Sequence, residues 1–231
     1  MTSTMPIVFL KNIIRSLAGS TIHSRQSFSQ EGEDLVIDRL LEGKRNGFYV
    51  EVGCHHPFRF SNTYFFYLRG WRGVCIDPLP GTKALFSQKR PRDIAIEKGV
   101  SLLKGKMKYF MFNEPALNTF DENIAQERDG LKGYKINKTV EIETDSLGAI
   151  LNENSAPETI DFLSVDVEGM DLQVLRSNDW KKFRPKIIVA ETLQSELNNI
   201  CNDPVSEFLH ELGYKPYAKT GCSVIFIETE K

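Results

Sequence analysis

The sequence lacks a cysteine pattern of the kind that builds metal sites or disulfide frameworks. Its four cysteines lie far apart and form no C-x-x-C pair: Cys54, Cys75, Cys201 and Cys222. Neither a zinc site nor a small disulfide framework is therefore indicated. Free cysteine is among the most buried residue types, so we expect reduced and mostly buried thiols.

A surplus of basic residues is also missing. The chain has 29 Lys and Arg against 31 Asp and Glu, which gives a formal net charge of -2. Proteins that bind nucleic acid usually carry a basic footprint that neutralises phosphates. We therefore expect no nucleic acid or other polyanion as a partner.

Long hydrophobic runs are absent as well. The one candidate, residues 6–17, is short and is interrupted by Lys11 and Arg15, so it cannot span a bilayer. It does not have the form of a secretory signal, because no basic residue precedes the apolar run and no clear small-residue cleavage site follows it. We expect no transmembrane segment and a cytoplasmic location, with a membrane-surface contact of this segment as a minor alternative.

The composition that remains is that of a globular protein. A chain of 231 residues with 41% hydrophobic and 26% charged residues can form one well-buried core, and no repeat or low-complexity linker divides it. Because chain termini are often poorly ordered, we expect a loosely ordered extension over residues 1–28. A single domain would then cover residues 29–231.

Apolar runs alternate with segments of helical periodicity over most of this domain. Parallel strands are expected at residues 48–52, 73–76, 93–97, 160–165 and 185–190, and helices at 29–41, 62–68, 80–88, 145–151, 170–176 and 204–212. Residues 214–217 and 223–227 would close the chain as an antiparallel hairpin. This alternation predicts a doubly wound α/β fold with a mostly parallel sheet.

One segment interrupts the alternation. In residues 101–144 we expect short strands at 106–112 and 139–143 around a polar, loop-like stretch rich in Asn, Asp and Glu. We interpret this segment as an insertion that shapes a substrate pocket.

Polar residues follow the first two strands, where open α/β sheets bind their ligands. Gly53 lets the backbone turn tightly beside a ligand, and Asp77 sits 24 residues further on, where a carboxylate can accept hydrogen bonds from both ribose hydroxyls of a nucleoside. The same spacing suits NAD, but the G-x-G-x-x-G loop that supports a pyrophosphate is missing. A nucleoside cofactor without phosphates, such as S-adenosylmethionine, fits better.

Several ordered motifs together resemble the FkbM family of methyltransferases. The motifs are SQEGEDL at 29–35, FYVEVG at 48–53, SNT at 61–63, GWRG at 70–73, IDP at 76–78 and DFLSVDVEG at 161–169. The resemblance covers about residues 29 to 192. It implies a Rossmann-like class I methyltransferase fold, with a seven-stranded, mostly parallel sheet, a C-terminal antiparallel hairpin and helices on both faces.

The resemblance also implies S-adenosylmethionine as methyl donor and O-methylation of a hydroxyl on a sugar, a glycan precursor or another secondary metabolite. The substrate would be a small molecule or a glycan. The implied cofactor-binding residues are Gln30, Glu51, Gly53, Asp77, Pro78 and Val100. Glu51 and Gly53 would line the methionine end, Asp77 the ribose and Gln30 the amino acid tail, and the loop around Val100 would pass near the adenine.

Three residues are candidates for catalysis. His56 lies just after the first strand and has an unperturbed pKa near 6.5, which suits proton removal at neutral pH; its alternative role is to hydrogen-bond locally and organise the loop before Pro57. Asp166 and Glu168 could receive the acceptor hydroxyl, orient the cofactor or coordinate a divalent cation. Their alternative role is to cap the helix that begins after Gly169. A metal is possible, but no spacing of ligands compels one.

Two rival functions remain at this stage. A nucleotide-sugar or NAD-using oxidoreductase would share the fold, but the absent phosphate loop argues against it. A non-catalytic protein that keeps the nucleoside pocket is the other rival, and the presence of Asp77, Asp166 and Glu168 favours an active enzyme over it.

Overall fold

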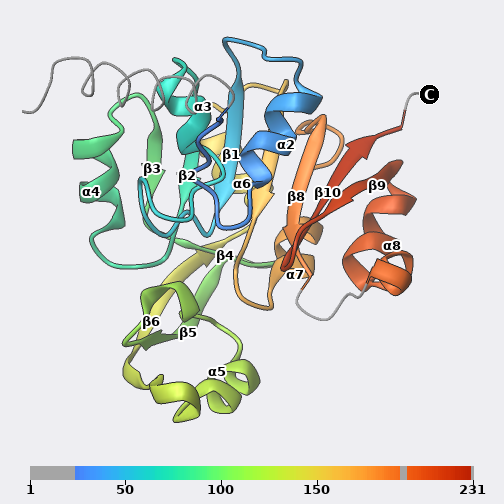
Figure 1. Ribbon diagram of the computed structural model, residues 1–231. Helices are drawn as coiled ribbons and strands as arrows, with labels where there is room; N and C mark the ends of the chain where they lie inside the picture. The colour runs from blue at the N-terminus through green and yellow to red at the C-terminus, as the bar shows by residue number, and fades with distance from the viewer. Residues whose placement is uncertain (1–23, 193–196, 230–231) are drawn as a thin grey trace, which may run out of the picture.

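The computed structural model describes residues 24–192 and 197–229. Its main element is a seven-stranded sheet with the order β3-β2-β1-β7-β8-β10-β9 (Figure 1). The strands are β1 (Phe48–Val52), β2 (Arg72–Ile76), β3 (Ile94–Ile96), β7 (Phe162–Val165), β8 (Ile187–Glu191), β9 (Tyr214–Lys219) and β10 (Ser223–Glu228). The first five in chain order run parallel, and β10 is antiparallel to β8 and β9. This confirms the predicted sheet with its C-terminal hairpin.

Helices cover both faces of this sheet, as predicted. The helices α2 (Glu33–Leu40), α3 (Tyr64–Leu68) and α4 (Thr82–Lys89) contribute Ile37, Phe66 and Phe86 to one hydrophobic cluster. The helices α6 (Leu147–Glu153), α7 (Asp171–Arg176) and α8 (Pro204–Glu211) contribute to a second cluster on the opposite face. The central strands β1, β7 and β8 are buried along their whole length, which explains why their sequences are continuous apolar runs rather than alternating ones.

The segment between the two halves of the main sheet builds a small sheet of its own, which projects from the carboxyl ends of the parallel strands (Figure 1). Its strands β4 (Gly99–Val100), β5 (Gly105–Phe112) and β6 (Ile136–Asp145) have the order β4-β6-β5. Strands β5 and β6 confirm the two expected strands, and β4 was not expected.

The polar stretch between β5 and β6 is not a simple loop. It contains the helix α5 (Glu122–Arg128) and two short 3₁₀ helices at Pro115–Leu117 and Leu131–Gly133. Asp121 caps α5 by accepting hydrogen bonds from the amides of Asn123 and Ile124. The sequence does not predict this helix because its residues are mostly polar and only Ala125 of α5 is buried.

Three further expectations concern the cysteines, the N-terminal extension and membrane-spanning helices. Cys54 and Cys75 are buried, but Cys201 is exposed and Cys222 is half-buried, so only two of the four free thiols are enclosed. Residues 27–28 belong to the predicted extension, yet Ser27 and the Phe28 amide donate hydrogen bonds to Asp34 in α2. Residues 6–17 lie outside the described residues, and within 24–192 and 197–229 no helix has the length and apolarity to cross a membrane.

Candidate functional site

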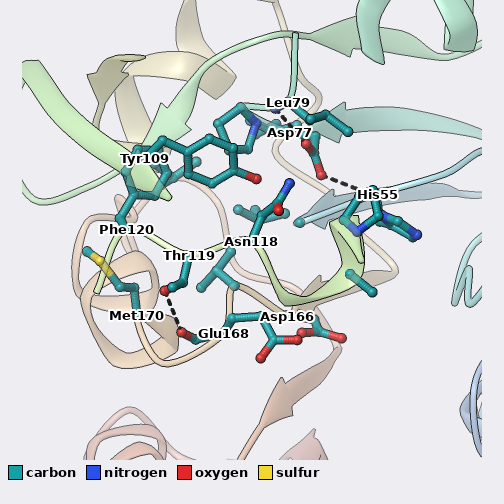
Figure 2. Close-up of a pocket in the computed structure, with 18 of the residues that line it drawn as sticks. His55, Asp77, Leu79, Tyr109, Asn118, Thr119, Phe120, Asp166, Glu168 and Met170 are labelled. Atoms are coloured by element: carbon teal, nitrogen blue, oxygen red, sulfur yellow. Dashed lines mark hydrogen bonds between the residues drawn. The ribbon is translucent and has the colours of Figure 1, made fainter. Parts of the chain in front are cut away.

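A cavity of about 820 Å³ lies at the carboxyl ends of β1, β2 and β7. The strand order reverses between β1 and β7, which is where open α/β sheets bind ligands. Loops after the three strands supply one wall with Gly53, Asp77 and Asp166. Figure 2 shows that side chains of the small sheet and its 3₁₀ segment, among them Tyr109 and Asn118, face these loops across the cavity.

Asp77, the residue that follows β2, anchors the loops at one end of the cavity. Its Oδ2 accepts the His55 amide at 2.7 Å and its Oδ1 accepts the Leu79 amide at 2.8 Å. Burial raises the pKa of Asp77 to about 6, and the two amides oppose that rise. A carboxylate has about four acceptor positions, so two remain for hydroxyl donors from a ligand.

Gly53 brings the loop after β1 against the loop after β7. Its φ is +80°, and a Cβ atom at this position would lie 1.7 Å from the carbonyl oxygen of Asp166. Only glycine combines that backbone conformation with so close an approach. Gly53 therefore permits the close contact between the two loops, which form part of this wall of the cavity.

The opposite wall is aromatic and comes from the insertion. Tyr109 and Phe120 lie with ring centroids 4.7 Å apart, and Val100 is 5% exposed beside them on the cavity lining. Thr119 ties this wall to the strand ends, because its hydroxyl donates to the Glu168 carbonyl at 2.9 Å (Figure 2). The cavity thus has a carboxylate at one position and a flat apolar surface at another, as a ribose and an adenine ring require.

Of the six predicted cofactor residues, five line this cavity: Gln30, Gly53, Asp77, Pro78 and Val100. Glu51 does not. Its side chain is 4% exposed, accepts the Thr63 hydroxyl at 2.5 Å and lies 4.0 Å from the Arg90 guanidinium. Burial raises the pKa of Glu51 to about 7. The expectation that Glu51 lines the methionine end is therefore corrected: its side chain is directed to the face of the sheet covered by α3.

Arg90, which sequence reasoning did not single out, organises that face. It is 0% exposed. It donates to Asp93 at 2.7 Å and to the hydroxyls of Tyr49 and Thr63 at 2.9 and 2.8 Å. A further bond to the Pro57 carbonyl fixes the loop after β1. Only Asp93 is close to Arg90 in the sequence; the other partners are brought to Arg90 by the fold, so the local sequence does not indicate this role.

The two histidines after β1 differ in position. His55 lines the cavity, whereas His56 is not among its lining residues. The Nδ1 atom of His56 accepts the amides of Phe58 and Arg59, both at 3.2 Å. An imidazole whose Nδ1 accepts carries its proton on Nε2 when neutral, so no lone pair remains for a substrate proton. The geometry favours the local loop-organising role of His56.

A second cavity of about 670 Å³ adjoins the first. Both cavities are lined by Gln30, Phe60, Asp166 and Glu168, so the two cavities adjoin at these residues, which we call the shared wall. The Asp166 side chain is accessible to solvent in the cavities, and many protein atoms surround it on its other sides. This partial burial, together with the nearby Glu168 carboxylate, raises the pKa of Asp166. Glu168 forms an ion pair with Arg128 of α5 at 2.6 Å.

Glu168 is held in an unusual backbone conformation, with a φ of +55°. A non-glycine residue in the left-handed region costs energy that the surrounding structure must offset, and such residues gather at functional sites. Its carboxylate pairs with Arg128, while α7 begins after the N-cap residue Met170. The pairing with a distant helix is not the helix-capping role considered as the alternative for Glu168.

The residues present fit a nucleoside cofactor that lacks phosphates. Asp77 keeps acceptor positions for ribose hydroxyls, Val100 and Tyr109 supply an apolar wall, and Gln30 offers an amide at the end nearer the second cavity. No glycine-rich phosphate loop follows β1 in the sequence.

Comparison with known proteins identifies the chain. The sequence model of the methyltransferase FkbM domain matches residues 51–216. No curated protein matches the chain in sequence. Among solved structures, the chain is similar to an O-methyltransferase from Bacillus cereus in complex with SAH, with 13% identity, 97% of this chain and 92% of that chain covered, and a TM-score of 0.45.

Two further solved structures are similar to the chain. A TehB-like SAM-dependent methyltransferase from Corynebacterium glutamicum has 10% identity, with 97% of this chain and 100% of that chain covered, and a TM-score of 0.41. The 1,6-didemethyltoxoflavin-N1-methyltransferase from Burkholderia thailandensis has 10% identity, with 100% and 93% covered, and a TM-score of 0.45. The assignment rests on the family match, which covers most of the chain. This chain belongs to the FkbM family and is an S-adenosylmethionine-dependent methyltransferase.

Proposed function

We propose that the enzyme methylates a hydroxyl group on a small polar molecule such as a sugar, a glycan precursor or another secondary metabolite. The observation that supports this most strongly is the pair of adjoining cavities. The first suits the cofactor, and the second shares Gln30, Phe60, Asp166 and Glu168 with it. An acceptor in the second cavity would meet the cofactor at that shared wall.

On the cofactor side, Asp77 would accept hydrogen bonds from the ribose and Val100 would lie against the adenine. Gln30 would hold the amino acid tail, because it lines both cavities. Gly53 and Pro78 would contact the cofactor with backbone and ring atoms as they line the cavity. Bound in this way, S-adenosylmethionine supplies an electrophilic methyl group on a sulfonium.

On the acceptor side, the second cavity offers many hydrogen-bond acceptors and an aromatic ring. Glu33, Asn62 and Ser223 line it, and Phe60 is 44% exposed at its edge. Carboxylates and amides pair with sugar hydroxyls, and an exposed ring can pack on the apolar face of a sugar. This composition favours a hydroxyl-rich acceptor.

Positioning supplies most of the catalysis in this proposal. The acceptor oxygen would form a bond to the methyl carbon while the electron pair of the broken carbon–sulfur bond stayed on sulfur, and Asp166 would accept the hydroxyl proton. Glu168, held by Arg128 at 2.6 Å, would orient the same hydroxyl. His56 is left outside this arrangement by its place away from the cavity lining.

The test is an acceptor screen with methyl-labelled S-adenosylmethionine. Sugars, nucleotide sugars and polyols are compared with primary amines of similar size, and the product bond is identified by mass spectrometry. We expect label in a hydroxyl-bearing acceptor, and loss of transfer by about 100-fold or more in Asp166→Asn. Label confined to amines would contradict O-methylation. Cofactor binding without transfer to any acceptor would contradict the proposed acceptor class.

A further inference from the structure

The second cavity has a strong excess of negative charge. Among the described residues, five carboxylates line it against one cation, Arg128; they are Glu31, Glu33, Asp166, Glu168 and Glu191. Glu31 and Glu33 each have a hydrogen-bond partner. Glu31 accepts a hydrogen bond from the Cys222 amide at 3.0 Å, and Glu33 accepts one from the Thr220 hydroxyl at 2.7 Å. Of the other three, Glu168 pairs with Arg128, and Asp166 and Glu191 have no cation partner among the described residues.

Those three carboxylates converge on one point. Asp166 and Glu168 follow β7, and Glu191 ends the neighbouring parallel strand β8. One oxygen atom from each lies within 4.8 Å of the corresponding atoms of the other two. Mg²⁺ takes oxygen ligands at about 2.0–2.1 Å, so two ligands on opposite sides of it are about 4.0 to 4.2 Å apart. The three oxygens therefore converge on one point, and small side-chain movements would bring them to ligand distances.

Glu191 provides an independent sign that a ligand belongs here. Its side chain is 7% exposed and lines the second cavity. Its Oε2 atom is buried, and no described residue gives it a hydrogen bond. Burial and the carboxylates of Asp166 and Glu168 raise the pKa of Glu191 far above its usual range. A buried polar atom without a partner costs free energy, and a bound cation would remove that cost.

We propose that Asp166, Glu168 and Glu191 bind one divalent cation of the Mg²⁺ or Mn²⁺ type at the wall shared by the two cavities. Hard divalent cations prefer oxygen ligands such as carboxylates, and they keep open positions that water or substrate oxygen can occupy. Arg128 pairs with one oxygen of Glu168, Oε2, at 2.6 Å, so the second oxygen of Glu168 and the other two carboxylates are left for the ion. The ion would lie where the acceptor meets the cofactor.

The role of this ion rests on the proposed function, but its binding does not. Bound at the shared wall, it would orient the acceptor hydroxyl through its oxygen and lower the pKa of that hydroxyl. Asp166 would then serve as a metal ligand, and the proton would leave to water in the open cavity.

Binding is tested with Mn²⁺ alone on chelator-treated full-length protein, without cofactor or acceptor. The loss of the free Mn²⁺ signal in electron paramagnetic resonance reports the bound fraction. We expect one site per chain. Glu191→Gln and Asp166→Asn should each weaken binding by about tenfold or more. The matched control is Glu141→Gln, an exposed carboxylate on β6, which should bind Mn²⁺ as the wild type does.

Two further readouts keep the outcome clear. Circular dichroism and the thermal midpoint verify that Glu191→Gln folds, and calorimetry verifies that it keeps the affinity for S-adenosylmethionine, because Glu191 does not line the first cavity. Absence of Mn²⁺ binding to folded wild-type protein would overturn the proposal, as would binding that both variants leave unchanged. Methyl transfer that continues in excess chelator would overturn the ion's role while leaving the proposed function intact.

Discussion

Gly53 and Asp166 approach each other so closely that a Cβ atom on Gly53 would lie 1.7 Å from the Asp166 carbonyl oxygen. This contact joins the loop after β1 to the loop after β7, on which the cofactor cavity and the shared wall both depend. Glycine is therefore required at position 53 for two reasons: its φ is positive, and a side chain would clash with Asp166.

Gly53→Ala should therefore displace the Asp166 loop. We expect a lower thermal midpoint and an affinity for S-adenosylmethionine reduced by about tenfold or more. The control is Gly43→Ala, because Gly43 has a similar φ of +70° but no atom within 4 Å of the added Cβ. The Gly43→Ala variant measures the effect of an alanine at a positive φ without a steric clash. Equal affinities in the two variants would show that the contact with Asp166 is unimportant.

The pH dependence of cofactor binding should follow Asp77. Burial raises its pKa to about 6, and the form that accepts ribose hydroxyls is the charged one. Affinity should therefore be full above that pKa and fall as pH decreases through it, by about tenfold between pH 7 and pH 5. Calorimetric titrations across this range measure the effect. In Asp77→Asn the affinity should be low throughout, and a variant curve parallel to that of the wild type would contradict the assignment.

Arg90 should be a major determinant of stability. It is 0% exposed and carries the only ion pair with Asp93 among the described residues, at 2.7 Å. Arg90→Met would leave that buried carboxylate without its cation, so the free energy of unfolding should fall by about 3 to 5 kcal/mol. Urea unfolding followed by circular dichroism measures this.

The matched control for Arg90 is Arg39→Met on the exposed side of α2, which should stay within about 0.5 kcal/mol of the wild type. A loss of stability in Arg90→Met no larger than that of the control would show that the buried network contributes little.

His56 should be dispensable for proton transfer. Its Nδ1 accepts the amides of Phe58 and Arg59, so His56→Ala should lower the thermal midpoint slightly. The affinity for S-adenosylmethionine should stay within about threefold of the wild type. A general base supplies about 100-fold or more, so a loss of methyl transfer on that scale with unchanged cofactor affinity would restore His56 as the base.

The sequence predicts most of the main sheet because its strands carry their own signal. Strands β1, β7 and β8 are short, mostly apolar runs buried throughout. At the ligand-binding edge β1 is followed by Gly53, and β7 and β8 by the polar residues Asp166 and Thr192. The helix α5 was missed because it buries only Ala125, and a polar helix differs little from a polar loop in sequence. The strand β4 was missed because it is two residues long, although both residues are buried.

The candidate site was only partly predictable for a related reason. Gly53 and Asp77 are marked by their places after strands, but Glu51 belongs to a strand buried on both faces, so its sequence position does not reveal which face it occupies. Its neighbour Arg90 is 39 residues away along the chain. Glu191 was visible as the residue that ends a strand, yet its convergence with Asp166 depends on the order of β7 and β8 in the sheet.

The most direct test of the account is a calorimetric titration of the purified protein with S-adenosylmethionine and, separately, with its demethylated product. The wild type should bind both ligands with micromolar affinity. Asp77→Ala should weaken that binding by about tenfold or more, equivalent to about 1.4 kcal/mol, while Glu191→Gln in the second cavity leaves it unchanged. Equal binding by the wild type and Asp77→Ala, or no binding by a folded wild type, would contradict the placement of the cofactor in the cavity around Asp77.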